Sequence, residues 1–140
     1  MVMRYLLDTD HISLLQRNHP QVKARLQTLT DKDYGVSIIS FEEQFKGWLT
    51  VISNSENDPQ KLALAYFRLE EMQQIYNRFP LCKFSEQASA KYFELRKTYR
   101  RIGKMDLRIA AIAINQDVIL VTRNAQDFGQ IAELTIESWD

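Results

Sequence analysis

Acidic side chains recur where the buried strands of the predicted sheet end. Asp8 and Asp10 follow the apolar run 3–7, and Asp106 opens an apolar segment further along the chain. The full set comprises Asp8, Asp10, Glu42, Glu43, Asp106, Asn124 and Asp127. Carboxylates on one rim repel each other, and a hard divalent cation with oxygen ligands, Mg²⁺ or Mn²⁺, relieves that repulsion. Such ions suit phosphodiester chemistry, because they activate water and stabilise charge on the attacking and leaving oxygens.

Each of these residues also has a purely structural interpretation. Asp8 stands where a helix N-cap is expected, and the segment 40–43 (SFEE) fits the S-x-x-E capping box. Asn124 and Asp127 are residue types that form turns. Asp106 would favour the dipole of its helix, but it heads a nearly all-apolar segment, where a charge near the core needs a partner.

Basic residues gather on both sides of Asp106. They are Arg96, Lys97, Arg100, Arg101, Lys104 and Arg108. The pairs 96/100, 97/101 and 104/108 have i,i+4 spacing and share a face wherever their segment is helical. They form either a solvated helix end that complements the dipole or a strip that holds a phosphate backbone beside the acids. Phe93, on the same segment, is expected in the core.

Strand-like runs alternate with longer helical patterns, which predicts an α/β fold with a mostly parallel sheet. Strands are expected at 3–7, 34–39, 80–84, 118–121 and 134–136. Helices are expected after Asp10 up to Pro20, over 22–29, from Ser40 through Ile52, from Pro59 through Tyr76, and over 86–101 and 106–115. In such folds ligands gather outside the carboxyl ends of the strands, where these acids would lie.

Length and composition predict one ordinary domain spanning residues 1–140. The chain has 18 Lys+Arg against 18 Asp+Glu, so polyanion binding must come from a local patch rather than from net charge. Its single cysteine, Cys82, excludes an intrachain disulfide and a zinc–thiolate cluster. No run approaches the roughly 18 apolar residues of a membrane span, so we expect a cytoplasmic protein without membrane association.

Four segments, in order, carry a resemblance to a known family. Residues 5–10 (YLLDTD) resemble LLDT(N/D), residues 36–43 (VSIISFEE) resemble S-x-I-(T/S)-x-x-E, residues 102–111 (IGKMDLRIAA) resemble (I/P)G-x-x-D-x-x-I-A-A, and residues 121–128 (VTRNAQDF) with 137–139 (ESW) resemble a final block ending in E-x-W. These are motifs of the PIN-domain family and, more narrowly, of the VapC-type toxins of bacterial toxin–antitoxin pairs.

The resemblance implies a three-layer α/β/α sandwich and a Mg²⁺- or Mn²⁺-dependent endoribonuclease that cleaves RNA. It also implies a cognate antitoxin that occludes the site, and commonly a homodimer. Asp8, Glu43 and Asp106 would be direct or water-mediated metal ligands. The other candidate catalytic residues are Asn124 and Asp127, Thr122 would shape the pocket, and Arg100, Arg101, Lys104 and Arg108 would contact RNA.

The chain departs from the family pattern in two places. Asn124 stands where many relatives carry a fourth Asp, so either Asp127 compensates or one metal ion is bound rather than two. Residues 44–46 (QFK) replace a more aliphatic run after the glutamate, which leaves Glu43 the least secure of the acids.

Two other functions fit parts of the sequence. Asp8-Thr9-Asp10 matches the D-x-D start of haloacid-dehalogenase-like phosphatases, with Asp8 as nucleophile and Asp10 as acid/base, but His11-Ile12 replaces the usual Gly-Thr. Asn124 would also suit a non-catalytic RNA- or protein-binding module of the same fold. In that case a partner helix in a groove would explain surface aromatics such as Trp48.

Overall fold

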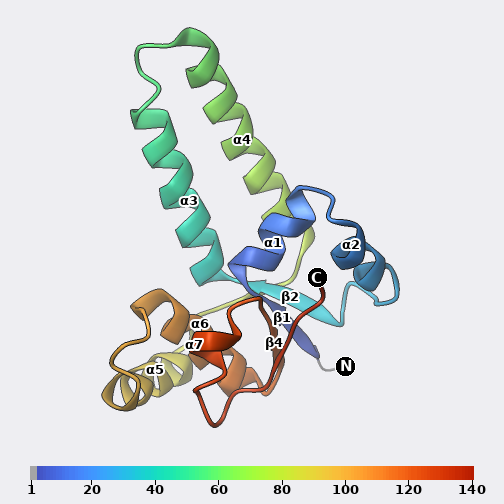
Figure 1. The fold of residues 1–140 in the computed structure, drawn as a ribbon, viewed down its shortest axis with the longest axis vertical. Coiled ribbons are helices and arrows are strands. Elements are labelled where there is room, and N and C mark those ends of the chain that lie inside the picture. The colour runs from blue at the N-terminus through green and yellow to red at the C-terminus, as the bar shows by residue number, and fades with distance from the viewer. Residues whose placement is uncertain (1–2) are drawn as a thin grey trace.

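The computed structural model describes residues 3–140 and contains a five-stranded sheet with helices on both faces (Figure 1). The elements are β1 (Tyr5–Leu7), α1 (Thr9–Gln16), α2 (Pro20–Gln27), β2 (Tyr34–Ser37), α3 (Ile38–Ser53), α4 (Pro59–Arg78), β3 (Leu81–Cys82), α5 (Glu86–Thr98), α6 (Lys104–Gln116), β4 (Ile119–Val121), α7 (Ala125–Phe128) and β5 (Ile136–Glu137). The strand order is β3-β2-β1-β4-β5, and every pairing is parallel. The predicted α/β/α fold with a parallel sheet is therefore confirmed.

Strand β1 lies at the centre of the sheet and buries both of its faces. Leu6 packs into a core with residues of α5 and α6, whereas Tyr5 and Leu7 pack with residues of α1, α2 and α4. This alternation follows from the two-residue period of a strand, and burial on both sides explains the continuous apolar run. The two cores hold the carboxyl end of β1 in place, and the first acidic residue follows there.

Helix α6 is the most deeply buried helix, as its nearly all-apolar sequence predicts. Leu107 and every residue from Ile109 to Ala113 are buried, and the helix packs against α5. Burial of each large aliphatic side chain contributes about 1.5–3 kcal/mol, so the position of α6 is strongly determined. Its first turn carries Asp106, which is thereby fixed by helix packing.

The start of α3 differs from the prediction. Strand β2 ends at Ser37 and the helix begins at Ile38, so the strand expected through residue 39 and the helix start at Ser40 are wrong. Ser37 is the N-cap, and its Oγ accepts a hydrogen bond of 3.0 Å from the Ser40 backbone N–H. Two β-branched residues resemble a strand in sequence, but this cap places Ile39 in the core from the first helical turn.

The basic segment is also less helical than expected. Helix α5 ends at Thr98 rather than near residue 101, so Arg100 and Arg101 lie in a turn and do not share a helical face with the residues four positions earlier. Phe93 is 55% exposed instead of being in the core, where its neighbour Tyr92 is buried. Lys104 and Arg108 do lie together on α6.

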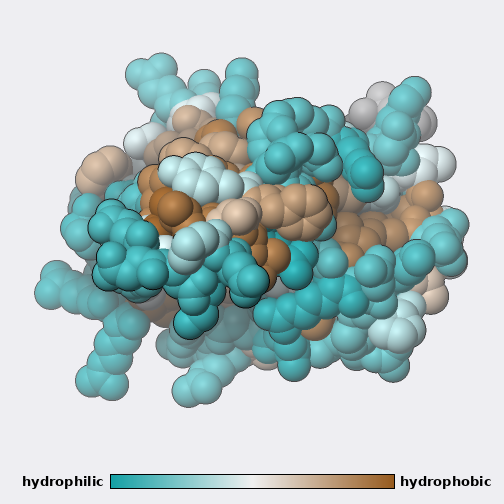
Figure 2. Space-filling model, turned by 90° about the horizontal axis from the view of Figure 1, so that it is seen from above, coloured by the Kyte–Doolittle hydropathy of each residue, from teal (hydrophilic) through white to brown (hydrophobic). Residues whose placement is uncertain are grey.

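Helices α3 and α4 form a hairpin that extends beyond the sheet (Figure 1). Its surface exposes apolar side chains, and Figure 2, viewed from the hairpin end, shows hydrophobic residues among hydrophilic ones. Within residues 3–140 no helix is both long and apolar enough to cross a lipid bilayer.

Candidate active site

The order of the strands creates a crevice at the carboxyl edge of the sheet. From β1 the sheet continues to β2 and β3 on one side and to β4 and β5 on the other, so β1 and β4 flank a topological switch point. Leu7 and Val121 are register partners there, and Asp8 and Thr122 directly follow them. Open α/β sheets bind ligands at such a point. The fold thus places Asp8 where the acidic pattern predicts chemistry.

Asp8 is buried and firmly held. The residue is only 5% exposed. Its Oδ1 caps α1 by accepting a 2.8 Å hydrogen bond from the Thr9 backbone N–H. Oδ2 accepts a 2.8 Å hydrogen bond from the Thr122 hydroxyl. Burial, reinforced by the nearby charges of Asp10 and Asp106, raises the pKa of Asp8 to about 7. Asp8 is therefore the N-cap of α1, as its structural interpretation predicts, and the same carboxyl group has a raised pKa.

Asp106 approaches the same crevice from the first turn of α6. Burial is again the main cause that raises its pKa, to about 6, and the charges of Glu43, Asp127 and Asp10 add to it. The charges that act on Asp106 therefore come from acids of α1, α3 and α7, and the charge of Asp106 acts in turn on Asp8, which follows β1. Asp106 thus lies within electrostatic reach of Glu43, Asp127 and Asp10, and its assignment as a metal ligand stays a prediction.

Glu43 is linked to Asp8 through Thr9. The Thr9 hydroxyl lies 2.7 Å from Glu43 Oε1 and 2.8 Å from Ser40 Oγ. A hydroxyl has one proton, so Thr9 donates to the carboxylate and accepts from Ser40. The expected capping box is therefore wrong, because the Glu43 side chain is directed to Thr9 instead of the start of α3.

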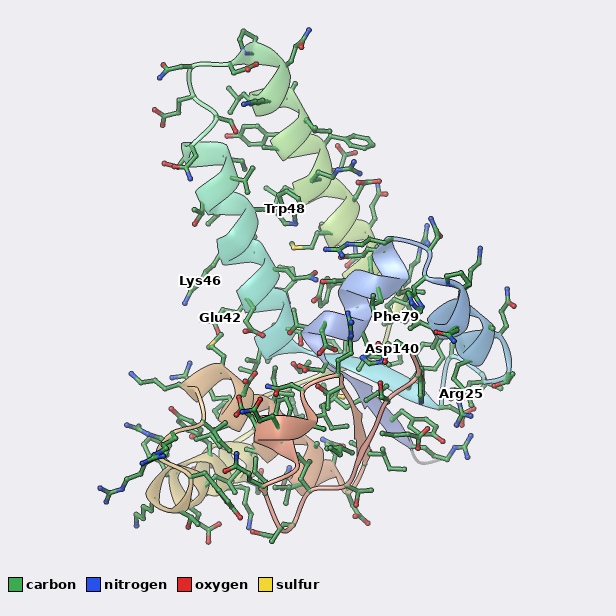
Figure 3. All side chains as sticks on the ribbon, viewed as in Figure 1. Arg25, Glu42, Lys46, Trp48, Phe79 and Asp140 are labelled. Atoms are coloured by element: carbon green, nitrogen blue, oxygen red, sulfur yellow. The ribbon has the colours of Figure 1, made fainter. Side chains whose placement is uncertain are left out.

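Glu42 has a different environment from Glu43. It forms an exposed i,i+4 ion pair with Lys46 at 3.2 Å on the outer side of α3 (Figure 3). Such a pair contributes little to stability and leaves Glu42 outside the crevice. The structure thus distinguishes the two adjacent glutamates and places Glu43 at the site.

Asn124 and Asp127 form the far side of the crevice and also form a turn. Asn124 caps α7, since its Oδ1 accepts from the Asp127 backbone N–H at 3.3 Å and its Nδ2 donates to Asp127 Oδ2 at 3.2 Å. The Asn124 backbone N–H donates to the Thr122 hydroxyl at 3.0 Å. Its carbonyl oxygen is thus engaged in a cap, and the acidic charge on this side comes from Asp127.

Sequence reasoning did not assign a role in the site to Thr9 or Tyr76. Thr9 stands inside the YLLDTD segment, so its position in the motif was the available signal. Tyr76 was expected only as a core residue of α4. It is buried, and its hydroxyl finds no hydrogen-bond partner within residues 3–140. Burial and the charges of Glu43 and Asp8 raise the pKa of Tyr76, which keeps its hydroxyl protonated near neutral pH.

The donor set at the crevice fits a hard divalent cation. Asp8, Asp106 and Glu43 supply only carboxylate oxygens, and a cation would offset both the burial and the mutual repulsion that raise the pKa values of the two aspartates. Across residues 3–140, no group of three or more His, Cys, Asp or Glu side chains is arranged closely enough to hold a metal ion by direct contacts alone. An ion held by these carboxylates would therefore keep water molecules among its ligands, as Mg²⁺ ordinarily does in proteins.

Only two of the four basic residues expected to contact RNA lie on the same helix as Asp106. Lys104 and Arg108 share α6 with Asp106, whereas Arg100 and Arg101 lie in the preceding turn. The Arg108 guanidinium lies 5.1 Å from the centroid of the Tyr92 ring, a cation–π distance. No ion pair in residues 3–140 joins these four cations to the acids of the site, so their charges are free for another partner.

The chain was compared with known families and structures. It matches the family model described as PIN domain over residues 5–134. It is 31% identical to Ribonuclease VapC1 of Haemophilus influenzae strain R2866, with 98% of each chain covered. It superposes on a chain of VapBC2 from Rickettsia felis bound to a DNA fragment from their promoter with a TM-score of 0.76 and 28% identity, covering 99% and 100% of the two chains. For VapBC-1 from nontypeable Haemophilus influenzae the TM-score is 0.74 at 27% identity, over 98% of each chain. Because the family model spans nearly the whole chain and the curated relative matches it end to end, this chain belongs to the PIN domain family.

Proposed function

We propose that this protein is a divalent-metal-dependent endoribonuclease and the toxin of a toxin–antitoxin pair, with residues 1–140 acting as one domain. The main support is that Asp8 and Asp106 both lie at the switch point of the sheet. Their pKa values are raised to about 7 for Asp8 and about 6 for Asp106. The relatives named Ribonuclease VapC support the choice of RNA as substrate.

Asp8, Asp106 and Glu43 would hold Mg²⁺ or Mn²⁺, either directly or through water. When bound, such an ion activates water and offsets charge on the phosphate oxygens. Thr122 and Thr9 fix the Asp8 and Glu43 carboxylates by hydrogen bonds of 2.8 and 2.7 Å. Because Asp8 and Asp106 retain protons to unusually high pH, cation binding near neutrality displaces protons from their carboxyl groups.

The RNA backbone would be held by Arg100, Arg101, Lys104 and Arg108. These cations precede and follow Asp106 in the chain, and no acid of the described residues neutralises them through an ion pair. Phosphate contacts position a nucleic acid without selecting its sequence. Since the whole chain is neutral, binding depends on this local charge and weakens as salt rises.

A cognate antitoxin would bind beside the acids, on the α3–α4 hairpin. A groove of about 660 Å³ lies between α1, α3 and α4, and Trp48 points into it from α3 (Figure 3). Grooves of this kind accept an amphipathic helix. The solved relatives contain toxin and antitoxin together, which supports such a partner here. We also propose that two copies of this protein form a homodimer.

The test is cleavage of RNA by the purified protein. Activity should require Mg²⁺ or Mn²⁺, stop when a chelator is added, and fall about 1,000-fold in Asp106→Asn, because several kcal/mol of charge stabilisation are lost. Asp117→Asn is a matched control, since Asp117 caps the other end of α6 in a left-handed conformation that Asn also adopts. Full activity of Asp106→Asn would show that the proposed function is wrong.

The phosphatase alternative is not supported by the geometry of Asp10. Both of its carboxylate oxygens accept hydrogen bonds, Oδ1 from His11 at 2.8 Å and Oδ2 from the Arg123 backbone N–H at 3.1 Å. A general acid/base must reach the reacting group, but Asp10 is engaged by its own protein.

A further inference from the structure

His11 is a buried polar residue three positions after Asp8, and both of its ring nitrogens are engaged. Its Nε2 accepts a hydrogen bond of 3.2 Å from the Trp139 backbone N–H. An accepting Nε2 has no proton, so the neutral ring carries its proton on Nδ1 and donates it to Asp10 Oδ1 at 2.8 Å. The ring is fully buried, which leaves it no alternative partner in solvent.

Asp10 connects His11 to the loop after β4, which lies beside Asp8. Its Oδ2 accepts from the Arg123 backbone N–H at 3.1 Å and thereby fixes the segment after β4. Thr122 stands in that segment, accepts from the Asn124 backbone N–H and uses its single proton to donate to Asp8 Oδ2 at 2.8 Å. A connected path therefore runs by hydrogen bonds from Trp139 through His11 and Asp10 to the Arg123 backbone N–H, along the backbone to Thr122, and by the Thr122 hydroxyl to Asp8.

The other end of the path is anchored by the segment 137–140. The Trp139 ring packs edge-on against Tyr5 at 5.2 Å, and its Nε1 donates to Glu137 Oε1 at 2.8 Å. Arg25 donates to the same Glu137 oxygen at 3.2 Å. Asp140 pairs with Arg123 Nε at 2.9 Å, and Figure 3 labels Arg25 and Asp140 in this region. The segment is thus attached to α2, β1 and the loop after β4.

We infer that His11 is a positioning residue: the Trp139 backbone N–H holds its ring at Nε2, and its Nδ1 hydrogen bond to Asp10 couples the ring to the metal-binding carboxylate of Asp8. The inference rests on the proposed function, because it concerns the same acids. Its physical basis is that hydrogen-bonded supports behind a metal ligand set the orientation of that ligand. Histidine is suited to this position, since one ring both accepts from Trp139 and donates to Asp10.

Two substitutions separate the hydrogen bond to Asp10, which the inference makes decisive, from the hydrogen bond that Trp139 donates to the ring. In His11→Asn the side-chain amide lies near the former Nδ1 position and can still donate to Asp10. In His11→Gln the carbonyl oxygen lies near the former Nε2 position and can still accept from Trp139. We expect His11→Gln to bind Mn²⁺ about 10-fold more weakly by calorimetry without RNA, and His11→Asn to stay within about 3-fold of the wild type. Both variants are measured well below their melting temperatures, since both lose a buried hydrogen bond.

Equal Mn²⁺ affinity in both variants and the wild type, or equal losses in the two variants, would overturn the inference. Asp8→Asn in the same titration tests the proposed function separately. If Asp8→Asn binds Mn²⁺ as the wild type does, the proposed function fails. If only Asp8→Asn loses affinity, the coupling through His11 fails.

The wild-type protein provides a test that needs no substitution. Nitrogen NMR should show His11 protonated on Nδ1 and unprotonated on Nε2. Saturating Mg²⁺ should shift the amide signal of Trp139, at the remote end of the path. An Nε2-protonated ring, or a Trp139 signal that Mg²⁺ leaves unmoved, would overturn the inference even if His11→Gln failed to fold.

Discussion

The carboxyl edge of the sheet and the α3–α4 hairpin differ in almost every physical property, although α3 serves both. At the edge, charged groups are buried and held by short hydrogen bonds, as at Asp8 and Thr122. On the hairpin, apolar side chains such as Leu64 and Phe67 are about half exposed. The first turns of α3 bring Glu43 to the edge, and later turns bring Trp48 to the groove. One region is built for ions and phosphates, and the other for an apolar partner.

The strongest test of this division compares the two adjacent glutamates of α3. Glu43→Gln should lower RNA cleavage about 100-fold, because it removes a charge that the site uses, while Glu42→Gln should stay within about 2-fold. Each substitution removes one negative charge from the same turn, so cleavage rates measured in parallel isolate position from charge. Equal effects of the two substitutions on the cleavage rate would show that Glu43 has no role in the site that Glu42 lacks.

Trp48→Ala tests the other region. We expect it to weaken binding of the cognate antitoxin about 30-fold, as for a central aromatic contact, and to leave RNA cleavage by the free toxin unchanged. Calorimetry with the antitoxin and a cleavage assay without it give the two readings. Lys46→Ala, an exposed residue two positions earlier on α3, is the control. A loss of cleavage in Trp48→Ala would mean that the groove and the edge are not independent.

The raised pKa values make stability at the edge depend on pH. The folded chain keeps protons on Asp8 up to about pH 7 and on Asp106 up to about pH 6, whereas the unfolded chain releases them near pH 4. Without metal, these groups therefore favour folding most below pH 4, and this contribution is lost as pH rises to 7. Thermal melts in chelator should show Asp8→Asn gaining several degrees over the wild type at pH 8 and none at pH 4. A gain of equal size at both pH values would contradict this origin.

The turn before α6 should give the smallest effect. Arg101→Ala is expected to raise KM for RNA about 3-fold and to reduce its salt dependence, with kcat unchanged, because one phosphate contact is lost. Arg68→Ala, on the hairpin and paired with Glu71, is a matched control that should leave KM unchanged. If both substitutions raise KM equally, RNA is not confined to the edge.

The sequence predicts what depends on local pattern, and this includes most of the fold. The apolar run ending at Asp8 and the buried helix behind Asp106 are both confirmed, since strands and core helices are marked by continuous burial. The start of α3 is not predictable in this way, because Ser37 and Ser40 are both good caps and tertiary packing of Ile39 decides between them. In the same way, the sequence does not decide whether Phe93 or Tyr92 lies in the core. The packing of α5 on α6 buries Tyr92 and leaves Phe93 exposed.

The acids of the site could be named from the sequence, but their support could not. Asp8, Glu43 and Asp106 follow from motif position, whereas Thr9 joins two helices and His11 joins α1 to Trp139, 128 residues away. Contacts of that range depend on how the sheet orders its strands. The motif position of Thr9 marks the residue itself, but no periodicity or spacing in the chain identifies the partners of Thr9 and His11.

In the proposed mechanism Asp8 and Asp106 together hold a divalent ion at the edge of the sheet. Titration of Mn²⁺ into the metal-free protein at pH 6.5, in buffers of different ionisation enthalpy, measures both affinity and released protons. We expect saturable binding that releases protons in the wild type, and loss of most of the affinity in Asp8→Asn and in Asp106→Asn. Unchanged binding in either variant, or binding without proton release, would contradict it.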